Sequence, residues 1–243
     1  MPVIASRHAR GLLRDRVANL DAGKITGVAD AGTIATWSDF SGLGNDAAQA
    51  TEAAKPTLRL NVWNGKPVAR FLGTNDLMTV AGLTGSFGGS DVPYSWCVVH
   101  APADPLPGDG SILSFGEQVT AFCELQLGNG NNRRDDAVAS ANVSGGGSTA
   151  AVFEVDSHSF AGTTVTTRKN GAVVQTDEPQ NVGVLTSNRF AIGARVLGAG
   201  YSNFMLGDIA RIDIHSRALS VQEMNYQAAR GRGRQLRPGV GYV

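Results

Sequence analysis

The sequence predicts an all-β fold, with many short strands in one large domain. Its 243 residues suit a single sandwich or barrel. Its 31 glycines fit frequent tight turns, while aromatic residues make up only 7%. Asn64-Gly65, which favours a type I′ hairpin turn, and Asn170-Gly171 each separate two strand-like runs. This composition argues against a large helical share.

The first element expected is a short amphipathic helix in a basic segment. Across residues 6–20 the apolar side chains recur at spacings of three and four, and the arginines lie largely elsewhere. Gly11 weakens this prediction because glycine disfavours helix interiors.

Strand-like runs follow in order. Residues 56–63 and 66–71 flank Asn64-Gly65, and a polar turn containing Asn75 and Asp76 comes next. Residues 94–100 are apolar on both faces, which predicts a central strand. Residues 129–136 and 144–148 are loops by composition. The other expected strands are residues 111–115, 121–127, 150–155, 163–168, 172–175, 190–193 and 207–215, the last with Ile212 and Ile214 on one face.

A C-terminal helix is expected after residue 220. Ser220 and Glu223 have the spacing of a capping box, in which the two side chains satisfy free amides at a helix start. The helix should run to about Arg230 and end at Gly231 and Gly233.

The two cysteines are expected to be buried. Cys97 and Cys123 both fall on inward-facing positions of predicted strands, where a free thiol behaves as a small apolar group. A disulfide between them is the alternative, but no secretion signal supports it.

Two distant motifs carry a family resemblance. Residues 37–47 read WSDFSGLGNDA, and residues 204–210 and 217–220 read FMLGDIA and RALS. They resemble the opening and closing signatures of laminin G-like domains of the concanavalin A-like lectin/glucanase superfamily, as found in phage and bacterial surface proteins. The resemblance covers about residues 20–229 and implies a jelly-roll sandwich of two antiparallel sheets, here with short N-terminal and C-terminal helices. The motif residues and Trp37 and Trp96 are expected at core and turn positions.

Basic ends flank an acidic body. Residues 1–19 form the expected amphipathic arm and residues 230–243 a basic tail, while residues 20–229 hold thirteen basic and twenty acidic side chains. The ends are either solvated tails or anchors on an acidic protein partner. Missing aromatic interleaving disfavours nucleic acid. The candidate anchoring residues are Arg7, Arg10, Arg14, Arg16, Arg232 and Arg234.

Several function classes find no support in the sequence. Residues 1–13 lack the apolar core of a signal peptide, and no run approaches the length of a membrane span, so we expect no membrane insertion. The four histidines are dispersed, so no metal or other cofactor is expected.

The turn at Asn75 and Asp76 offers too few oxygen ligands for calcium. Glu154 and Asp156 supply two letters of the superfamily's catalytic strand, which reads E-x-D-x-E or E-x-D-x-x-E, but His158 and Ser159 stand at the two possible places of the third. We therefore expect no catalysis and interpret the acidic pair as a solvated edge.

Sugar binding fits the expected fold better than catalysis. An aromatic ring stacks on the apolar face of a pyranose while polar side chains hold its hydroxyls. The candidate glycan-binding residues are Trp63, Tyr201, Glu124, Gln126, Arg133 and Arg134.

The sequence thus favours a non-enzymatic surface protein of a phage-like virion, attached to head or tail. It would be made in the host cytoplasm and would contact other virion proteins and host cell-surface polysaccharide. The sequence leaves open whether it forms a homo-oligomer. The alternatives are a structural decoration or tail-associated protein without a glycan ligand and, second, a glycan hydrolase.

Overall fold

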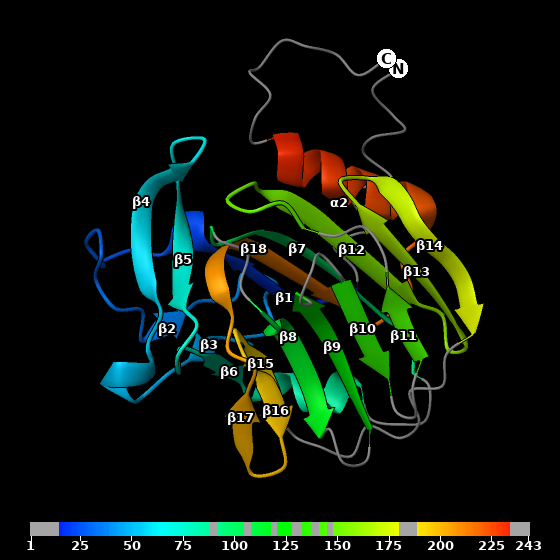
Figure 1. Cartoon of the computed structure of the whole chain (residues 1–243), viewed down its shortest axis with the longest axis horizontal. Helices are drawn as coiled ribbons and strands as arrows, with labels where there is room; N and C mark the ends of the chain where they lie inside the picture. The colour runs from blue at the N-terminus through cyan, green and yellow to red at the C-terminus, as the bar shows by residue number, and fades with distance from the viewer. Residues whose placement is uncertain are drawn as a thin grey trace.

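The protein is a sandwich of two antiparallel β-sheets with a helix on its outside (Figure 1). The computed structural model describes residues 15–87, 92–104, 108–117, 121–127, 133–137, 141–144, 148–179 and 189–233. In this part of the chain each sheet has eight strands. The predicted all-β sandwich is therefore confirmed.

The first sheet has the order β14-β13-β12-β7-β18-β5-β4, with β1 also paired to β18. Its central strand β7 is buried along its whole length, as its two apolar faces predicted. Its strands are β1 (Arg16–Asp21), β4 (Thr57–Trp63), β5 (Lys66–Leu72), β7 (Tyr94–Pro102), β12 (Glu154–Phe160), β13 (Thr164–Lys169), β14 (Ala172–Pro179) and β18 (Leu206–His215).

The second sheet has the order β11-β10-β9-β8-β15-β6-β3-β2. Its strands are β2 (Thr36–Trp37), β3 (Ala47–Ala48), β6 (Met78–Val80), β8 (Gly110–Glu117), β9 (Ala121–Leu127), β10 (Arg133–Ala137), β11 (Ala141–Ser144) and β15 (Phe190–Ile192). A separate hairpin joins β16 (Arg195–Leu197) to β17 (Gly200–Ser202), and the short 3-10 helices are η1 (Ala22–Lys24), η2 (Glu52–Ala54) and η3 (Gly82–Ser86).

The loop predicted for residues 129–136 is wrong over residues 133–136, which belong to β10. Strand β11 ends at Ser144, the first residue of the loop predicted for residues 144–148. The sequence of β10 is RRDDA, with no apolar alternation to indicate a strand. The segment is a strand because its backbone pairs with β9 on one side and β11 on the other.

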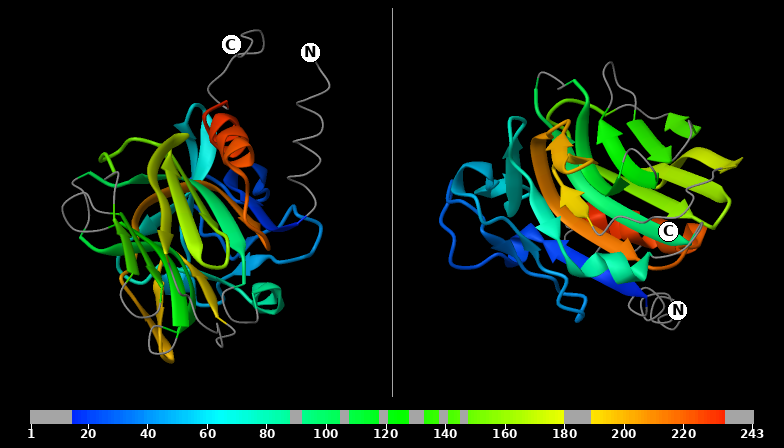
Figure 2. Two further views of the ribbon diagram at one scale, coloured as in Figure 1. Left: turned by 90° about the vertical axis from the view of Figure 1, so that its right-hand side faces the viewer. Right: turned by 90° about the horizontal axis from the view of Figure 1, so that it is seen from below.

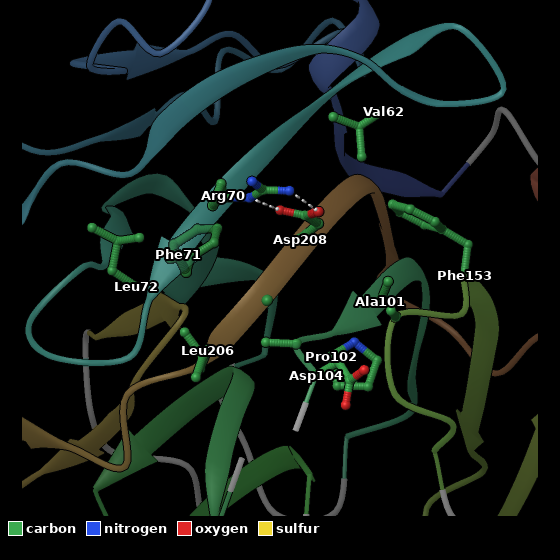
Figure 3. A pocket seen from close by; sticks show the side chains of 13 residues that line it. Val62, Arg70, Phe71, Leu72, Ala101, Pro102, Asp104, Phe153, Leu206 and Asp208 are labelled. Atoms are coloured by element: carbon green, nitrogen blue, oxygen red, sulfur yellow. Dashed lines mark hydrogen bonds and ion pairs between the residues drawn. The ribbon is translucent and has the colours of Figure 1, made fainter. Parts of the chain in front are cut away.

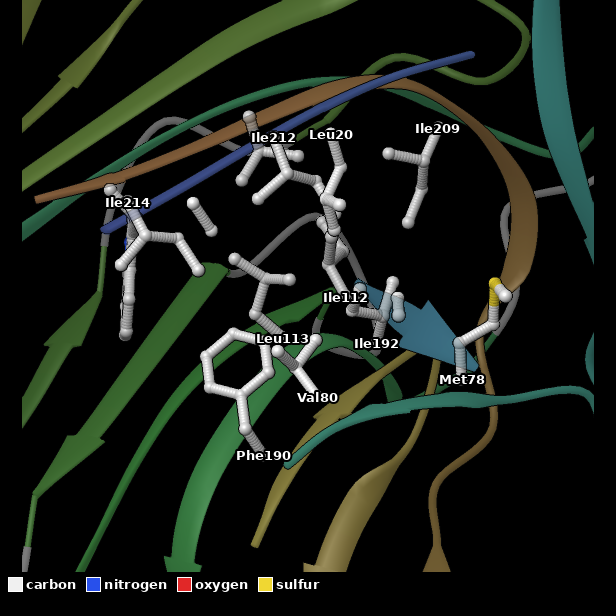
Figure 4. Packing of buried hydrophobic residues seen from close by; sticks show 14 of the residues in the cluster. Leu20, Met78, Val80, Ile112, Leu113, Phe190, Ile192, Ile209, Ile212 and Ile214 are labelled. Carbon is white, nitrogen blue, oxygen red and sulfur yellow. The ribbon is translucent and has the colours of Figure 1, made fainter. Parts of the chain in front are cut away.

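The core lies between the two sheets (Figure 4). Ile209, Ile212 and Ile214 project from β18, and Leu113 and Phe190 meet them from β8 and β15. Ile212 and Ile214 share the inward face, as predicted. Trp37 and Trp96 are 0% and 1% exposed, which confirms that both belong to the core.

The motif at residues 37–47 forms a turn organised by Asp39. Its carboxylate accepts hydrogen bonds from the backbone amides of Asn19, Ser41 and Asn45 and from the Ser41 hydroxyl. Burial alone would raise the pKa of Asp39, but these hydrogen bonds outweigh burial and lower it. Gly42 and Gly44 have positive φ angles of 95° and 74°, so the motif consists of core and turn positions.

The N-terminal helix prediction is wrong where the structure can test it. Residues 16–20 belong to β1, which pairs with β18, while residues 6–14 lie outside the described part. Ala18 and Leu20 are buried in the core, and pairing with a distant strand outweighs the local helical pattern. Arg16 forms an ion pair with Asp213 and donates a hydrogen bond to the Phe40 carbonyl. Its side chain therefore stabilises the fold and is not the solvent-facing anchor that the sequence predicts.

Helix α2 (Val221–Gly233) begins as predicted and extends past Arg230 to Gly233. It lies on the outside of the sandwich (Figure 2). The Ser220 amide donates to the Glu223 carboxylate at 2.9 Å, and the Glu223 amide donates to the Ser220 hydroxyl at 3.3 Å. Gly231 does not end the helix: a Cβ there would lie 2.7 Å from Val155 Cγ2, so the glycine lets α2 approach the first sheet. Among the described helices, none is long and apolar enough to cross a membrane.

Candidate functional site

A pocket of about 460 Å³ opens on the outer face of the first sheet (Figure 3). Strands β5, β7 and β18 contribute to it, together with the segment that precedes β12 and one residue of β4. Its lining residues are Val62, Arg70, Phe71, Leu72, Ala101, Pro102, Ala103, Asp104, Ala151, Phe153, Leu206, Gly207 and Asp208.

A charged pair lies in the middle of this pocket. Arg70 and Asp208 are directly opposite each other on β5 and β18. The Arg70 Nε and Nη2 atoms donate to the two Asp208 carboxylate oxygens at 2.7 and 2.8 Å. These hydrogen bonds raise the pKa of Arg70, although burial acts against them. The pair is rigid and bidentate, yet the Arg70 side chain remains 35% exposed and can reach a ligand.

An aromatic ring forms one wall of the pocket. Phe153 is half-buried and precedes β12, and its ring stacks on Trp63 with centroids 5.5 Å apart. Trp63 itself is 4% exposed, so the expectation that it is exposed for sugar binding is wrong. It packs with Val68 and Val155 on the outer face of the first sheet. Trp63 therefore supports Phe153 from behind.

Apolar side chains and one acid surround the charged pair. Leu72 is 54% exposed and Val62 37% exposed, and both line the pocket. Asp104 is exposed beside Pro102. Gly207 lies where β18 passes β7, and a Cβ there would be 2.4 Å from the Ala101 carbonyl oxygen, so only glycine permits this approach.

Two predicted sugar ligands on the second sheet are covered. Glu124 and Gln126 face outward, as predicted, but they are 0% and 1% exposed. Arg195 on β16 donates to Glu124 Oε2 at 2.7 Å and to Gln126 Oε1 at 3.1 Å. The β16–β17 hairpin thus closes over both side chains, and they do not face a ligand from an open sheet. Local sequence gave no sign of this cover.

The remaining predicted sugar ligands stay predictions. Tyr201 on β17 is partly exposed, with the Arg189 guanidinium 4.6 Å from its ring centroid, and it does not line the pocket. Arg133 and Arg134 lie on β10, and their side chains are outside the described structure.

The predicted anchoring arginines other than Arg16 also stay predictions. Arg232 lies in α2, with its side chain outside the description. Arg7, Arg10, Arg14 and Arg234 lie outside the described residues.

The acidic pair on β12 is buried, which corrects its interpretation as a solvated edge. Glu154 and Asp156 are each 1% exposed and share the inward face of β12 with Phe160. Asp156 Oδ2 lies 2.7 Å from His100 Nε2, and Glu154 Oε1 lies 2.7 Å from Lys169 Nζ. Strand pairing places Glu154 opposite His100, a proximity that linear spacing could not indicate.

This buried cluster has some features of a metal site. His100, Glu154 and Asp156 each offer a ligand atom, and the three atoms lie within 4.8 Å of one another. The Lys169 ammonium group already pairs with the Glu154 carboxylate, however, and a positive charge at that distance disfavours binding of a metal cation.

The turn at Asp76 is satisfied as predicted, since the Asp76 carboxylate accepts a hydrogen bond from the Leu72 amide at 2.7 Å.

The buried thiol also differs in position from the prediction. Cys97 is free and buried, but it packs with Val99, Val155 and Ala228 beneath α2 rather than between the sheets. Burial raises its pKa to about 12. The side chain of Cys123 lies outside the description.

No family model and no curated protein matches the chain. Several solved structures share its fold. The binding domain of botulinum neurotoxin serotype D matches with a TM-score of 0.65 at 13% identity, over 95% of this chain and 53% of that one. A Trypanosoma rangeli sialidase matches with a TM-score of 0.60 at 10% identity, over 89% of this chain and 33% of the sialidase. The CBM40 of Ruminococcus gnavus IT-sialidase, bound to α2,3 sialyllactose, matches with a TM-score of 0.55 at 11% identity, over 65% of this chain and 94% of that one.

These likenesses show that the chain shares the β-sandwich fold of these proteins. At such identities they concern the fold alone, and the chain spans only a third of the sialidase. The laminin G-like and phage relationship inferred from the motifs stays a prediction.

Proposed function

We propose that this protein is a non-enzymatic carbohydrate-binding module and that the pocket around Arg70 and Asp208 is its sugar site. The observation that carries the proposal is the pairing of an accessible aromatic wall with a fixed Arg–Asp pair in one pocket. Phe153 offers a ring for the apolar face of a pyranose, and the charged pair offers donors and acceptors for its hydroxyls. Domains with this fold have been solved with sialyllactose and with N-acetylneuraminic acid, which supports a carbohydrate ligand.

The wider role that we propose is attachment of a phage-like particle to host cell-surface polysaccharide. The resemblance of residues 37–47 and 204–220 to phage surface modules supports it. Glycan hydrolysis is the less favoured alternative, because Glu154 and Asp156 are buried in the sandwich interior. A structural decoration protein without a ligand is the other alternative. Immunogold labelling of purified particles from the producing strain tests the location, and absence of label would contradict it.

Calorimetric titration with a panel of oligosaccharides tests the sugar site. Phe153→Ala removes the stacking ring and should weaken binding about fivefold or more, since an aromatic contact contributes roughly 1 kcal/mol beyond its buried area. Val152→Ala is the matched control, because Val152 is the adjacent residue, is 47% exposed and does not line the pocket. Equal affinity of wild type and Phe153→Ala for the sugar would show that this pocket is not the sugar site. Absence of binding to every sugar would favour the decoration protein.

A further inference from the structure

We infer that the pocket binds an uncharged sugar that carries a methyl group, such as a 6-deoxyhexose or an N-acetylhexosamine. This inference rests on the proposed function. It separates the protein from structural neighbours that were solved with sialylated, and therefore acidic, sugars.

The charges of the pocket disfavour an acidic ligand. Among the described residues that line it, the charged ones are Arg70, Asp104 and Asp208, which leave one net negative charge. The only cation among them already donates through two nitrogens to Asp208. A carboxylate sugar would have to separate this bidentate pair or lie close to two carboxylates, and both arrangements are unfavourable.

The same pair suits two neighbouring hydroxyls. Each Asp208 oxygen accepts one bond from Arg70, so the carboxylate keeps lone pairs for two further donors. Within the described residues the third nitrogen of Arg70, Nη1, makes no hydrogen bond, so it can donate to a hydroxyl oxygen. A vicinal diol both donates and accepts, which matches this arrangement without any charge on the ligand.

Apart from the charged pair and Asp104, the side chains that line the described part of the pocket are apolar. Leu72, Leu206 and Pro102 stand around the charged pair, with Phe153 on the opposite side (Figure 3). A hexose with hydroxyls on every carbon would leave some of them without partners against these side chains, at a cost in binding. A methyl group fits there. The volume of about 460 Å³ lies in the range of small-molecule pockets, roughly 300–1,000 Å³.

Titration with paired sugars tests this inference. L-fucose is compared with L-galactose, and N-acetylglucosamine with glucose, so that each pair differs by the methyl-bearing group. At least one methyl-bearing member should bind about tenfold or more tightly than its counterpart, the usual value of a methyl-sized group in an apolar pocket. Sialyllactose should bind less tightly than that preferred sugar.

A charge variant sharpens the test. Asp104→Lys changes the pocket from one net negative to one net positive charge and alters an exposed side chain. It should strengthen binding of sialyllactose several-fold and leave the neutral sugar within about twofold, since rim charges act mainly on charged ligands. Leu43→Lys is the control, because Leu43 is 63% exposed and outside the pocket, and it should alter neither affinity.

The outcomes separate the two proposals. If sialyllactose binds wild type more tightly than every neutral sugar, and Phe153→Ala abolishes that binding, the inference falls while the proposed function stands. If neither methyl-bearing sugar binds more tightly than its counterpart, the methyl requirement falls. If no sugar binds, the proposed function falls and the inference falls with it.

Discussion

His215 should make the stability of the protein fall in mild acid. It lies on β18 beneath α2, is 0% exposed, and its Nε2 is 3.4 Å from Gln227 Nε2. Burial lowers the pKa of His215 to about 4. The charges of Arg217 and Arg16 act in the same direction, and those of Asp213 and Glu223 act against it. The folded protein therefore holds this histidine neutral where a free histidine would be protonated.

The sign and size of the effect follow from the two pKa values. Between the unfolded value of 6.5 and the folded value of about 4, the unfolded chain binds more protons than the folded protein. Stability contributed by neutral His215 is complete above the unfolded pKa and is lost as the pH falls through this window. The difference corresponds to about 3 kcal/mol, at about 1.4 kcal/mol per pKa unit.

Urea unfolding followed by tryptophan fluorescence at about pH 7 and about pH 4.5 measures this loss. His215→Gln removes the titrating group. Between about pH 7 and about pH 4.5 the variant should therefore lose about 2 to 3 kcal/mol less of its free energy of unfolding than wild type loses. Glu52→Gln is the control, because Glu52 is exposed on η2 and its charge does not act on His215. Hydrogen bonds from Lys55 and Thr33 lower the pKa of Glu52 from its ordinary value of 4.5, so its contribution is lost only below about pH 4.5. Parallel pH profiles for wild type and His215→Gln would refute the reasoning.

Two further predictions concern the layer beneath α2. Gly231→Ala should lower the free energy of unfolding by about 1 kcal/mol, because overpacking against Val155 outweighs the better helix propensity of alanine. Gly108→Ala is the control, because a Cβ at Gly108 would meet open space. A Gly231→Ala protein more stable than wild type would contradict the packing argument. In a Cys123→Ser background, Cys97 should resist a thiol reagent at about pH 8 until the protein unfolds, because burial raises its pKa to about 12 and only the thiolate reacts; rapid labelling of the native protein would show that α2 opens.

Features that depend only on residues close together in the sequence were predictable. The turns Asn64-Gly65 and Asn170-Gly171 both have positive φ at their two central residues, as type I′ geometry requires. The capping box at Ser220 and Glu223 forms the expected pair of hydrogen bonds. In each case the backbone and side chains that interact are within a few residues, so the local sequence contains the whole interaction.

The candidate site was not predictable in this way. The sequence predicts Trp63 as an exposed aromatic residue, whereas Trp63 is buried behind Phe153, which lines the pocket. Nothing in the local sequence marks Arg70 or Asp208 as a site residue, since each by itself is an ordinary charged residue of a strand. Their pairing requires that β5 and β18 be neighbours in one register.

By itself the sequence determined the class of fold, the hairpin turns, the start of α2 and the place of Trp37 in the core, because side-chain periodicity and turn chemistry act over short stretches of chain. Only the tertiary structure decided that residues 16–20 form a strand, that Arg195 covers Glu124, and that Arg70, Asp208 and Phe153 share one pocket. These outcomes depend on which distant strands pair and on what lies across a sheet face. Such pairing is set by the burial and hydrogen bonding of the whole sandwich, so no local pattern of residues contains it.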